Sequence, residues 1–156
     1  MRAPIESAME KIMSIDQKNT EENNRRQLLL ALGHDGPQEA LEALQTYYSA
    51  DFVRHGDKGD YDKERLADGL SRLYTGFPDL KRTQHDVIVD GDRVAYRWEA
   101  TGTHRGEYLG VRPTGRPITA QGIVMCRFED GLIAEEWASW NRASLLHDLG
   151  IIPLGR

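Results

Sequence analysis

Two side chains capable of acid–base chemistry occupy positions where the pattern calls for apolar residues. His104 and Glu136 both fall at even positions of runs in which apolar and polar residues alternate. Side chains alternate along a strand, so the even positions of each run share one face of a sheet. A carboxylate can orient an imidazole and raise its basicity. We therefore predict that both are catalytic, with His104 moving a proton and Glu136 orienting it or acting as the complementary acid.

Structural roles for the same two residues remain open alternatives. A buried charge or imidazole needs a partner wherever it lies. His104 would then be a core histidine that bonds a loop carbonyl and shapes the Pro-Thr-Gly-Arg loop that follows it. Glu136 would form an ion pair with a helix arginine, such as Arg54 or Arg72.

Five further residues are candidates for binding a substrate. Aromatic side chains on an inner face provide shape and area for a planar ligand, although they also fill cores. His55 follows a short apolar pair, and an asparagine at the end of the last strand either binds a carbonyl or caps the next helix. The predicted substrate-binding residues are His55, Tyr96, Trp98, Trp140 and Asn141.

Composition and missing motifs argue against several other kinds of site. The single Cys126 excludes an intrachain disulfide framework and any CxxC site. Neither an HExxH motif nor a cluster of three carboxylates is present, and no GxGxxG or Walker motif appears. A net charge of −5 argues against a nucleic-acid-binding face. Without a long apolar run or a signal-like apolar segment, we expect a cytoplasmic protein with no metal, no cofactor and no membrane contact.

The first half of the chain reads as helical. Apolar residues recur at helical spacing, and Gly33-His34-Asp35-Gly36 separates the first two helices. Asn19 and Thr20 precede two glutamates, which is typical of a helix N-terminus. The expected helices cover residues 21–32, about 37–48, about 66–77 and a short C-terminal segment around 145–149, with residues 1–18 as an amphipathic helical extension.

From Lys81 onward the period changes to two, which indicates strands. Asp90-Gly91-Asp92 and Glu129-Asp130-Gly131 are hairpin signals. The expected strands cover residues 81–89, 93–104, 118–128 and 132–140, with a short extended piece at 52–55. Helices followed by long antiparallel strands predict an α+β fold in which a curved sheet leaves a pocket against the helices.

Several of these segments also carry a family resemblance. The run Thr101-Gly102-Thr103-His104-Arg105-Gly106, the segment from Arg127 to Trp137 and the final Leu145-Leu146-His147-Asp148-Leu149-Gly150 resemble the SnoaL-like polyketide cyclase family. The resemblance covers residues 19–152 and implies one domain at 19–156 after the extension at 1–18. It also implies an NTF2-like cone, with a curved antiparallel sheet wrapped around three helices and a central pocket. A homodimer without a cofactor is the implied assembly.

The resemblance points to a reaction class and opens an alternative. Founding members close a ring by intramolecular aldol condensation with an aspartate on the last strand, and that position corresponds to Ala138 here. The expected function is cofactor-free ring closure or rearrangement of an apolar polyketide-type or prenylated small molecule, including epoxide opening. The alternatives are a non-catalytic small-molecule-binding protein and an isomerase or epoxide hydrolase.

Overall fold

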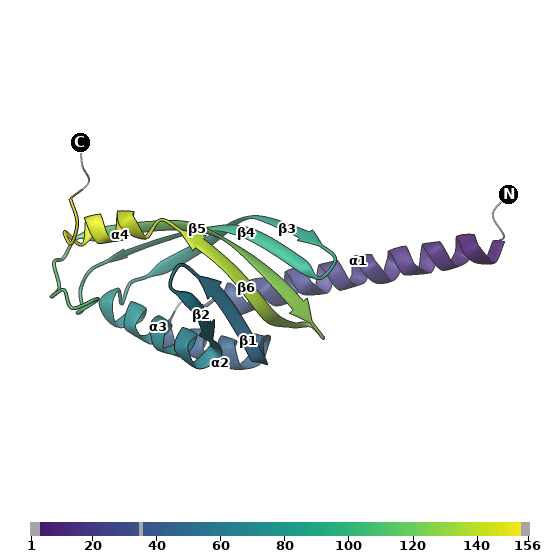
Figure 1. Cartoon of the computed structure of the whole chain (residues 1–156), viewed down its shortest axis with the longest axis horizontal. Coiled ribbons are helices and arrows are strands. Elements are labelled where there is room, and N and C mark those ends of the chain that lie inside the picture. The colour runs from purple at the N-terminus through teal and green to yellow at the C-terminus, as the bar shows by residue number, and fades with distance from the viewer. Residues whose placement is uncertain (1–3, 35, 154–156) are drawn as a thin grey trace.

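A curved six-stranded sheet and the helices packed against it form an α+β fold, as expected (Figure 1). The computed structural model describes residues 4–34 and 36–153. In chain order the elements are α1 (Pro4–Leu32), α2 (Pro37–Tyr47), β1 (Tyr48–Gly56), β2 (Gly59–Asp62), α3 (Lys63–Gly76), β3 (Lys81–Asp90), β4 (Arg93–Thr103), β5 (Pro117–Glu129), β6 (Leu132–Trp140) and α4 (Arg142–Asp148). No helix in these two ranges is long and apolar enough to cross a membrane.

The sheet has the strand order β2-β1-β6-β5-β4-β3. Its neighbouring strands are antiparallel except β1 and β6, which run parallel. The extended piece predicted at 52–55 is the end of β1, and Gly56 and Gly59 turn the chain into β2 instead of ending the sheet. In Figure 1 the sheet curves over α2 and α3, with α4 near one end. This curvature leaves a concave face that α2 and α3 cover.

Helix α1 is longer than the sequence predicts. It runs unbroken from Pro4 to Leu32, and Thr20 lies in its interior, where its hydroxyl donates to the Asp16 carbonyl at 2.9 Å. The predicted helix start at Asn19 and Thr20 is therefore wrong, because this hydroxyl bonds back along the helix rather than capping it. Side chains 5–20 are exposed, and the N-terminal part of α1 projects away from the body (Figure 1).

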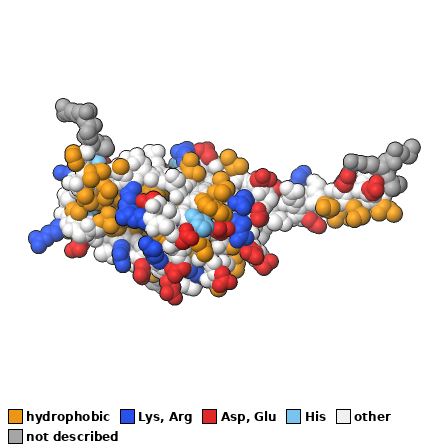
Figure 2. All heavy atoms as spheres, viewed as in Figure 1, with side chains coloured by type: hydrophobic (Ala, Val, Ile, Leu, Met, Phe, Trp, Pro, Cys, Tyr) orange, Lys and Arg blue, Asp and Glu red, His pale blue; other side chains and the backbone are white. Residues whose placement is uncertain are grey.

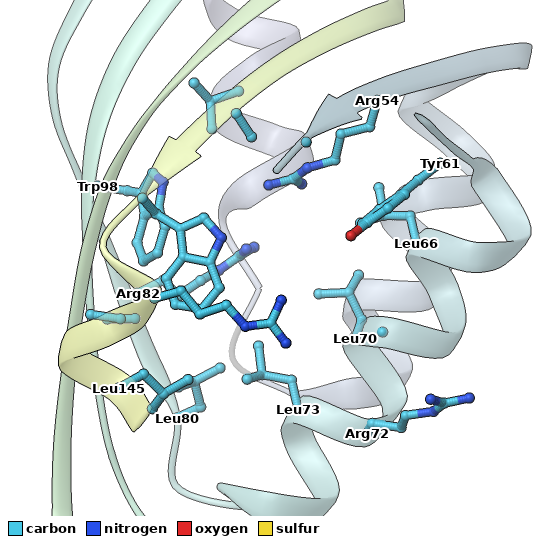
Figure 3. Close-up of a pocket in the computed structure, with 18 of the residues that line it drawn as sticks. Arg54, Tyr61, Leu66, Leu70, Arg72, Leu73, Leu80, Arg82, Trp98 and Leu145 are labelled. Carbon is cyan, nitrogen blue, oxygen red and sulfur yellow. The ribbon is translucent and has the colours of Figure 1, made fainter. Parts of the chain in front are cut away.

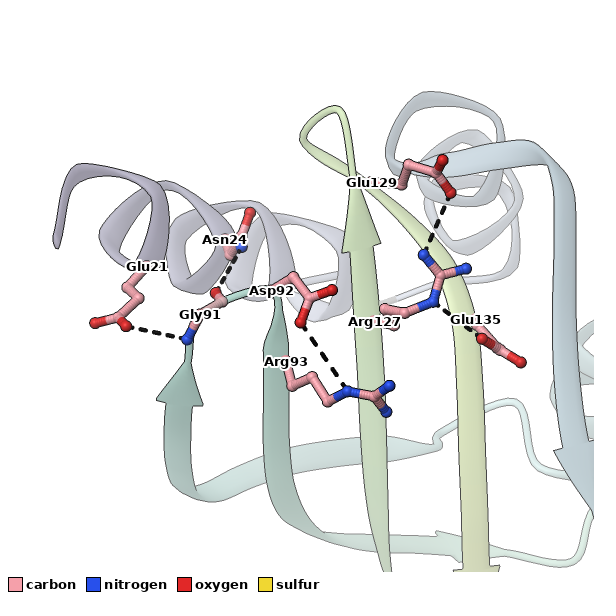
Figure 4. Close-up of polar contacts among 8 residues, drawn as sticks. All are labelled: Glu21, Asn24, Gly91, Asp92, Arg93, Arg127, Glu129 and Glu135. Atoms are coloured by element: carbon pink, nitrogen blue, oxygen red, sulfur yellow. Dashed lines mark hydrogen bonds and ion pairs between the residues drawn. The ribbon is translucent and has the colours of Figure 1, made fainter. Parts of the chain in front are cut away.

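The C-terminal part of α1 is fastened to the turn between β3 and β4 (Figure 4). The Glu21 carboxylate accepts a hydrogen bond from the Gly91 amide at 3.0 Å, and the buried Asn24 amide donates to the Gly91 carbonyl at 3.2 Å. Leu28, Ala31 and Leu32 then enter the main hydrophobic core. Only this last part of α1 contributes to the packed fold.

The predicted inner face is confirmed along β4 and β5, where Tyr96, Ala100, Val124 and Cys126 are buried. At the β5–β6 hairpin the two turn residues, Asp130 and Gly131, have φ values of 51° and 76°. Two consecutive residues with positive φ are typical of the hairpin turns that match strand twist. A register shift beside Phe128 then brings Ile133 into the core, although its odd number predicts the outer face.

Candidate active site

A cavity of about 420 Å³ lies between the concave face of the sheet and α3 (Figure 3). Leu66, Leu70 and Leu73 of α3 are spaced at i, i+4 and i+7, so one helix face supplies an apolar wall. In Figure 3 these leucines face Trp98 on the sheet, and Arg54 reaches in from β1. Mostly apolar walls with a few polar groups are typical of small-molecule sites.

The three aromatic residues predicted to bind substrate all line this cavity. Tyr96 and Trp98 come from β4 and Trp140 from the end of β6. Trp98 pairs with Gly122 of β5, and Gly122 pairs in turn with Trp140. A Cβ atom on Gly122 would lie 2.6 Å from the Trp140 Cβ and 2.8 Å from the Trp98 ring. The absence of a side chain at Gly122 therefore leaves room for the two indoles, whose ring centres are 6.3 Å apart.

Glu136 does not line this cavity itself and is 1% exposed. Its Oε1 accepts the Tyr48 hydroxyl at 3.2 Å and the Cys126 thiol at 3.6 Å, and its Oε2 accepts the Arg54 guanidinium at 3.3 Å. These distances are long for hydrogen bonds to a carboxylate. A smaller cavity of about 30 Å³ touches Glu136 and shares Arg54, Arg82 and Tyr96 with the large one. The small cavity that Glu136 borders therefore shares part of its wall with the main cavity.

Burial controls the ionisation of the groups around Glu136. Desolvation, and after it the charge of Glu136, raises the pKa of both the Tyr48 and the Tyr96 hydroxyl well above the ordinary value. Burial acts to lower the pKa of the Arg54 guanidinium, but the opposing charge of Glu136 leaves that pKa raised. Tyr96 therefore stays protonated as a donor, and Arg54 stays charged. Within the described ranges, the Tyr96 hydroxyl makes no hydrogen bond.

Among the polar cavity residues that sequence reasoning missed are Arg82 and Gln84 of β3. Arg82 pairs with Ala100 and Gln84 with Trp98, so both share the inner face of β4. The alternation that identified His104 and Glu136 also runs through residues 81–89, and applying it there would have found both. Arg82 donates to His34 Nε2 at 3.1 Å, which brings the loop after α1 to the cavity as well.

His104 is fully buried but does not line the cavity. Its Nδ1 accepts from the Thr114 amide at 3.3 Å and lies 3.0 Å from the Thr114 hydroxyl, and its ring lies 5.5 Å from that of Phe77. Its Nε2 has no hydrogen-bond partner in the described part of the chain. These contacts fit the alternative in which His104 shapes the loop that follows it, and that loop brings Tyr108 and Leu109 to the cavity rim.

The structure also separates His104 from Glu136. Through the sheet register Glu136 pairs with Cys126, and Cys126 pairs with Val94 at the start of β4. His104 follows the far end of that strand, ten residues later, which is roughly 30 Å of strand at ~3.3 Å per residue. Our expectation that His104 and Glu136 are partners is therefore wrong. The odd–even alternation assigns both side chains to one face of the sheet, but it does not fix their positions along the strands.

The other two predicted binding residues lie outside the cavity lining. His55 lies on the outer face of the sheet, where Nε2 contacts Glu135 at 2.7 Å, Nδ1 contacts Asp60 at 2.8 Å and the ring stacks on Trp137. Asn141 caps α4 by accepting the Ser144 amide at 3.1 Å, which is the second of its two predicted roles. Within residues 4–34 and 36–153, no group of three or more His, Cys, Asp or Glu side chains could hold a metal ion.

Comparison with known proteins identifies the family of this chain. A family model described as SnoaL-like polyketide cyclase matches residues 34–149. IdmH from Streptomyces antibioticus, a proposed polyketide cyclase, is 31% identical with a TM-score of 0.67, over 83% of this chain and 98% of that chain. AclR from Streptomyces galilaeus, a proposed hydroxylase, is 26% identical with a TM-score of 0.78, over 85% and 99%.

A SnoaL-like protein from Jannaschia sp. CCS1 shares the fold at 20% identity, with a TM-score of 0.77 over 86% of this chain and 96% of that chain. No curated protein matches this chain. The family match covers most of the chain, and the fold agrees with it. The chain therefore belongs to the SnoaL-like polyketide cyclase family.

Proposed function

We propose that the chain is a cofactor-free cyclase that closes or rearranges a ring in a polyketide-type or prenylated small molecule. The observation that carries the proposal is the position of Glu136, a buried carboxylate close to a cavity of about 420 Å³ whose walls are mostly apolar. Tyr96, a protonated donor whose hydroxyl has no hydrogen-bond partner among the described residues, lines the same cavity. A base and a proton donor at the end of a mostly apolar space are the elements of enolate chemistry.

The proposed reaction needs only proton transfers and one new carbon–carbon bond. Glu136 takes a proton from the carbon next to a substrate carbonyl, either directly or through one water molecule in the 30 Å³ space, which has room for it. The Tyr96 hydroxyl donates a hydrogen bond to the enolate oxygen as charge develops there. The enolate carbon then attacks a second electrophilic carbon of the same molecule, and the oxygen that receives the electron pair takes up the proton.

His104 has a different place in this proposal from the one the sequence suggests. Because it is bonded to Thr114 and does not line the cavity, we assign it the role of holding the loop that carries Tyr108. Epoxide hydrolysis is less well supported, since it would need a second carboxylate next to the substrate. The other acidic residues of the cavity are exposed, and Asp57 is paired with Arg142 at 3.6 Å.

A specific observation favours one second candidate, a protein that binds its ligand without changing it. Both Glu136 oxygens already have partners, and Ala138 lies on the cavity where the founding family members carry their aspartate. Exchange of the protons next to the carbonyl of 1-tetralone, measured by mass spectrometry in D₂O, distinguishes the two. An enzyme accelerates deuterium uptake over buffer, whereas a carrier binds the ketone and leaves its exchange rate unchanged.

We further propose that the chain forms a homodimer through the outer face of the sheet. Ile88, Ala95, Met125 and Trp137 are register partners in turn across β3, β4, β5 and β6, so they form one row across that face. Ile88 is 66% exposed, and Ile123 beside the row is 58% exposed. A second copy would remove this apolar row from water.

A further inference from the structure

The cavity is basic although the chain as a whole is acidic. Six basic side chains line it: Arg54, Lys58, Arg65, Arg72, Arg82 and Arg142. Only two acidic side chains do so, Asp57 and Asp68, whereas the chain carries a net charge of −5. In Figure 2 basic side chains gather on the part of this face between α3 and α4. The local excess of positive charge is therefore a property of the site and favours an anionic ligand.

Most of these cations already have partners within the described residues. Arg54 pairs with Glu136, and Arg142 pairs with Asp57. Arg65 lies over the Tyr61 ring, with its guanidinium carbon 4.1 Å from the ring centre. Lys58 and Arg72 are exposed, where water solvates their charge. These five side chains need no ligand to satisfy them.

Arg82 differs from the other five. It is half-buried, lines both cavities and has no carboxylate within ion-pair distance in the described part of the chain. Its hydrogen bond goes to His34 Nε2, and because a guanidinium can only donate, that nitrogen is the acceptor and brings no negative charge. The bond therefore leaves the charge of Arg82 uncompensated. The charge of Arg82 acts to lower the pKa of Tyr48 and of Tyr96, against the larger effect of burial. Arg82 therefore lies close to both hydroxyl groups.

Gln84 lies next to Arg82 on the same face of β3. It also lines the cavity, and no hydrogen bond to its side-chain amide is found within the described ranges. Residues two apart on a strand project side by side, so the amide and the guanidinium present donors to the same region. A guanidinium matches a carboxylate in a planar, two-bond geometry, which a single neutral donor does not offer.

We propose that Arg82, assisted by Gln84, binds a carboxylate of the ligand, so that the substrate of this site is a carboxylic acid with an apolar, ring-forming body. This inference rests on the proposed function only in taking the large cavity as the substrate site. The acid would be held at β3, while Tyr96 and Glu136 act on a carbonyl further along the molecule. The carboxylate anchor thereby fixes which carbon faces the base.

A matched pair of probes tests the carboxylate site by binding alone. Naphthalene-2-carboxylate and its methyl ester have the same ring, and quenching of the fluorescence of Trp98 and Trp140 reports their binding to the cavity. We expect the acid to bind the wild-type protein about tenfold more tightly than the ester, as one charge-assisted bond pair implies. In Arg82→Gln the ratio of acid affinity to ester affinity should fall to about one, and in Arg82→Lys and Gln84→Leu this ratio should be intermediate.

Arg26→Gln is the matched control, because Arg26 is exposed on α1 and does not line the cavity, and it should keep the wild-type ratio. Equal binding of acid and ester by the wild type, or a preference that survives in a folded Arg82→Gln variant, would overturn the assignment. So would failure of both probes to bind at millimolar concentration. A preference for the acid together with no deuterium uptake by bound 1-tetralone would leave this site standing while the proposed cyclase function fails.

Discussion

Glu136 is the candidate site residue whose burial and pairing the sequence predicts most closely. Its even position on an otherwise apolar strand predicts a buried carboxylate that needs a partner, and the partner is Arg54, one of the two arginines considered for it. The odd–even alternation could not show how far along its strand a side chain lies. For that reason the sequence pattern also paired Glu136 with His104, which follows the far end of β4.

Gly122 sets the spacing of Trp98 and Trp140, and a methyl group there should disturb both. In Gly122→Ala the new Cβ atom would lie 2.7 Å from the Ser139 carbonyl and closer still to the Trp140 Cβ. We expect a loss of about 1–3 kcal/mol in the free energy of unfolding, typical of overpacking. Urea denaturation measures it. Gly69→Ala, at an exposed helical glycine with open space around it, is the control and should not destabilise.

A weakened affinity for naphthalene-2-carboxylate should accompany the loss of stability in Gly122→Ala. Unchanged stability together with unchanged affinity would show that the two indoles do not depend on Gly122 for their positions.

At the scale of elements, the helices and the four long strands were predictable because their periods are long and regular. The β1–β2 hairpin was not, since it is short and its two glycines resemble a chain break. The helix start expected at Asn19 and Thr20 is wrong for a local reason, because the Thr20 hydroxyl donates to the Asp16 carbonyl inside the continuous helix α1. The bulge beside Phe128 likewise has no signal in the alternation, yet it decides that Ile133 is buried.

His55 ties β1 and β2 to β6 on the outer face, and this tie should depend on pH. Hydrogen bonds to Glu135 and then Asp60 raise the pKa of His55 above its ordinary value of 6.5, while His55 and then Arg127 lower the pKa of Glu135 below 4.5. The contribution of His55 is complete below pH 6.5 and is lost as pH rises through its raised pKa. The contribution of Glu135 is complete above pH 4.5 and is lost as pH falls through its lowered pKa.

His55→Gln should therefore destabilise the protein more at pH 5.5 than at pH 9. Urea unfolding of wild type and variant at the two pH values measures the difference. Glu129→Gln, which removes the exposed second partner of Arg127, serves as the comparison and should show no such dependence between these two values. An equal effect of His55→Gln at both pH values would contradict the assignment of the tie to a protonated imidazole.

At the scale of the whole molecule, the two faces of the sheet have different roles. The concave face forms the cavity, and the convex face carries the row from Ile88 to Trp137 that we assign to a homodimer. Light scattering with size exclusion should give a dimer for the wild type and a monomer for Met125→Glu. Ile12→Glu, at a 58% exposed position on the projecting part of α1, should remain a dimer. A monomeric wild type would contradict this assignment.

The central claim is that Glu136 acts as a base on a ligand held in the concave face. The most direct measurement is the rate of deuterium uptake next to the carbonyl of 1-tetralone in D₂O, compared between wild type, Glu136→Gln and the control Arg26→Gln, at an exposed position outside the cavity lining. We predict that Glu136→Gln slows protein-dependent uptake by about 10²-fold or more, as expected for loss of a general base, while Arg26→Gln keeps the wild-type rate. Uptake by a folded Glu136→Gln protein at the wild-type rate would contradict the claim.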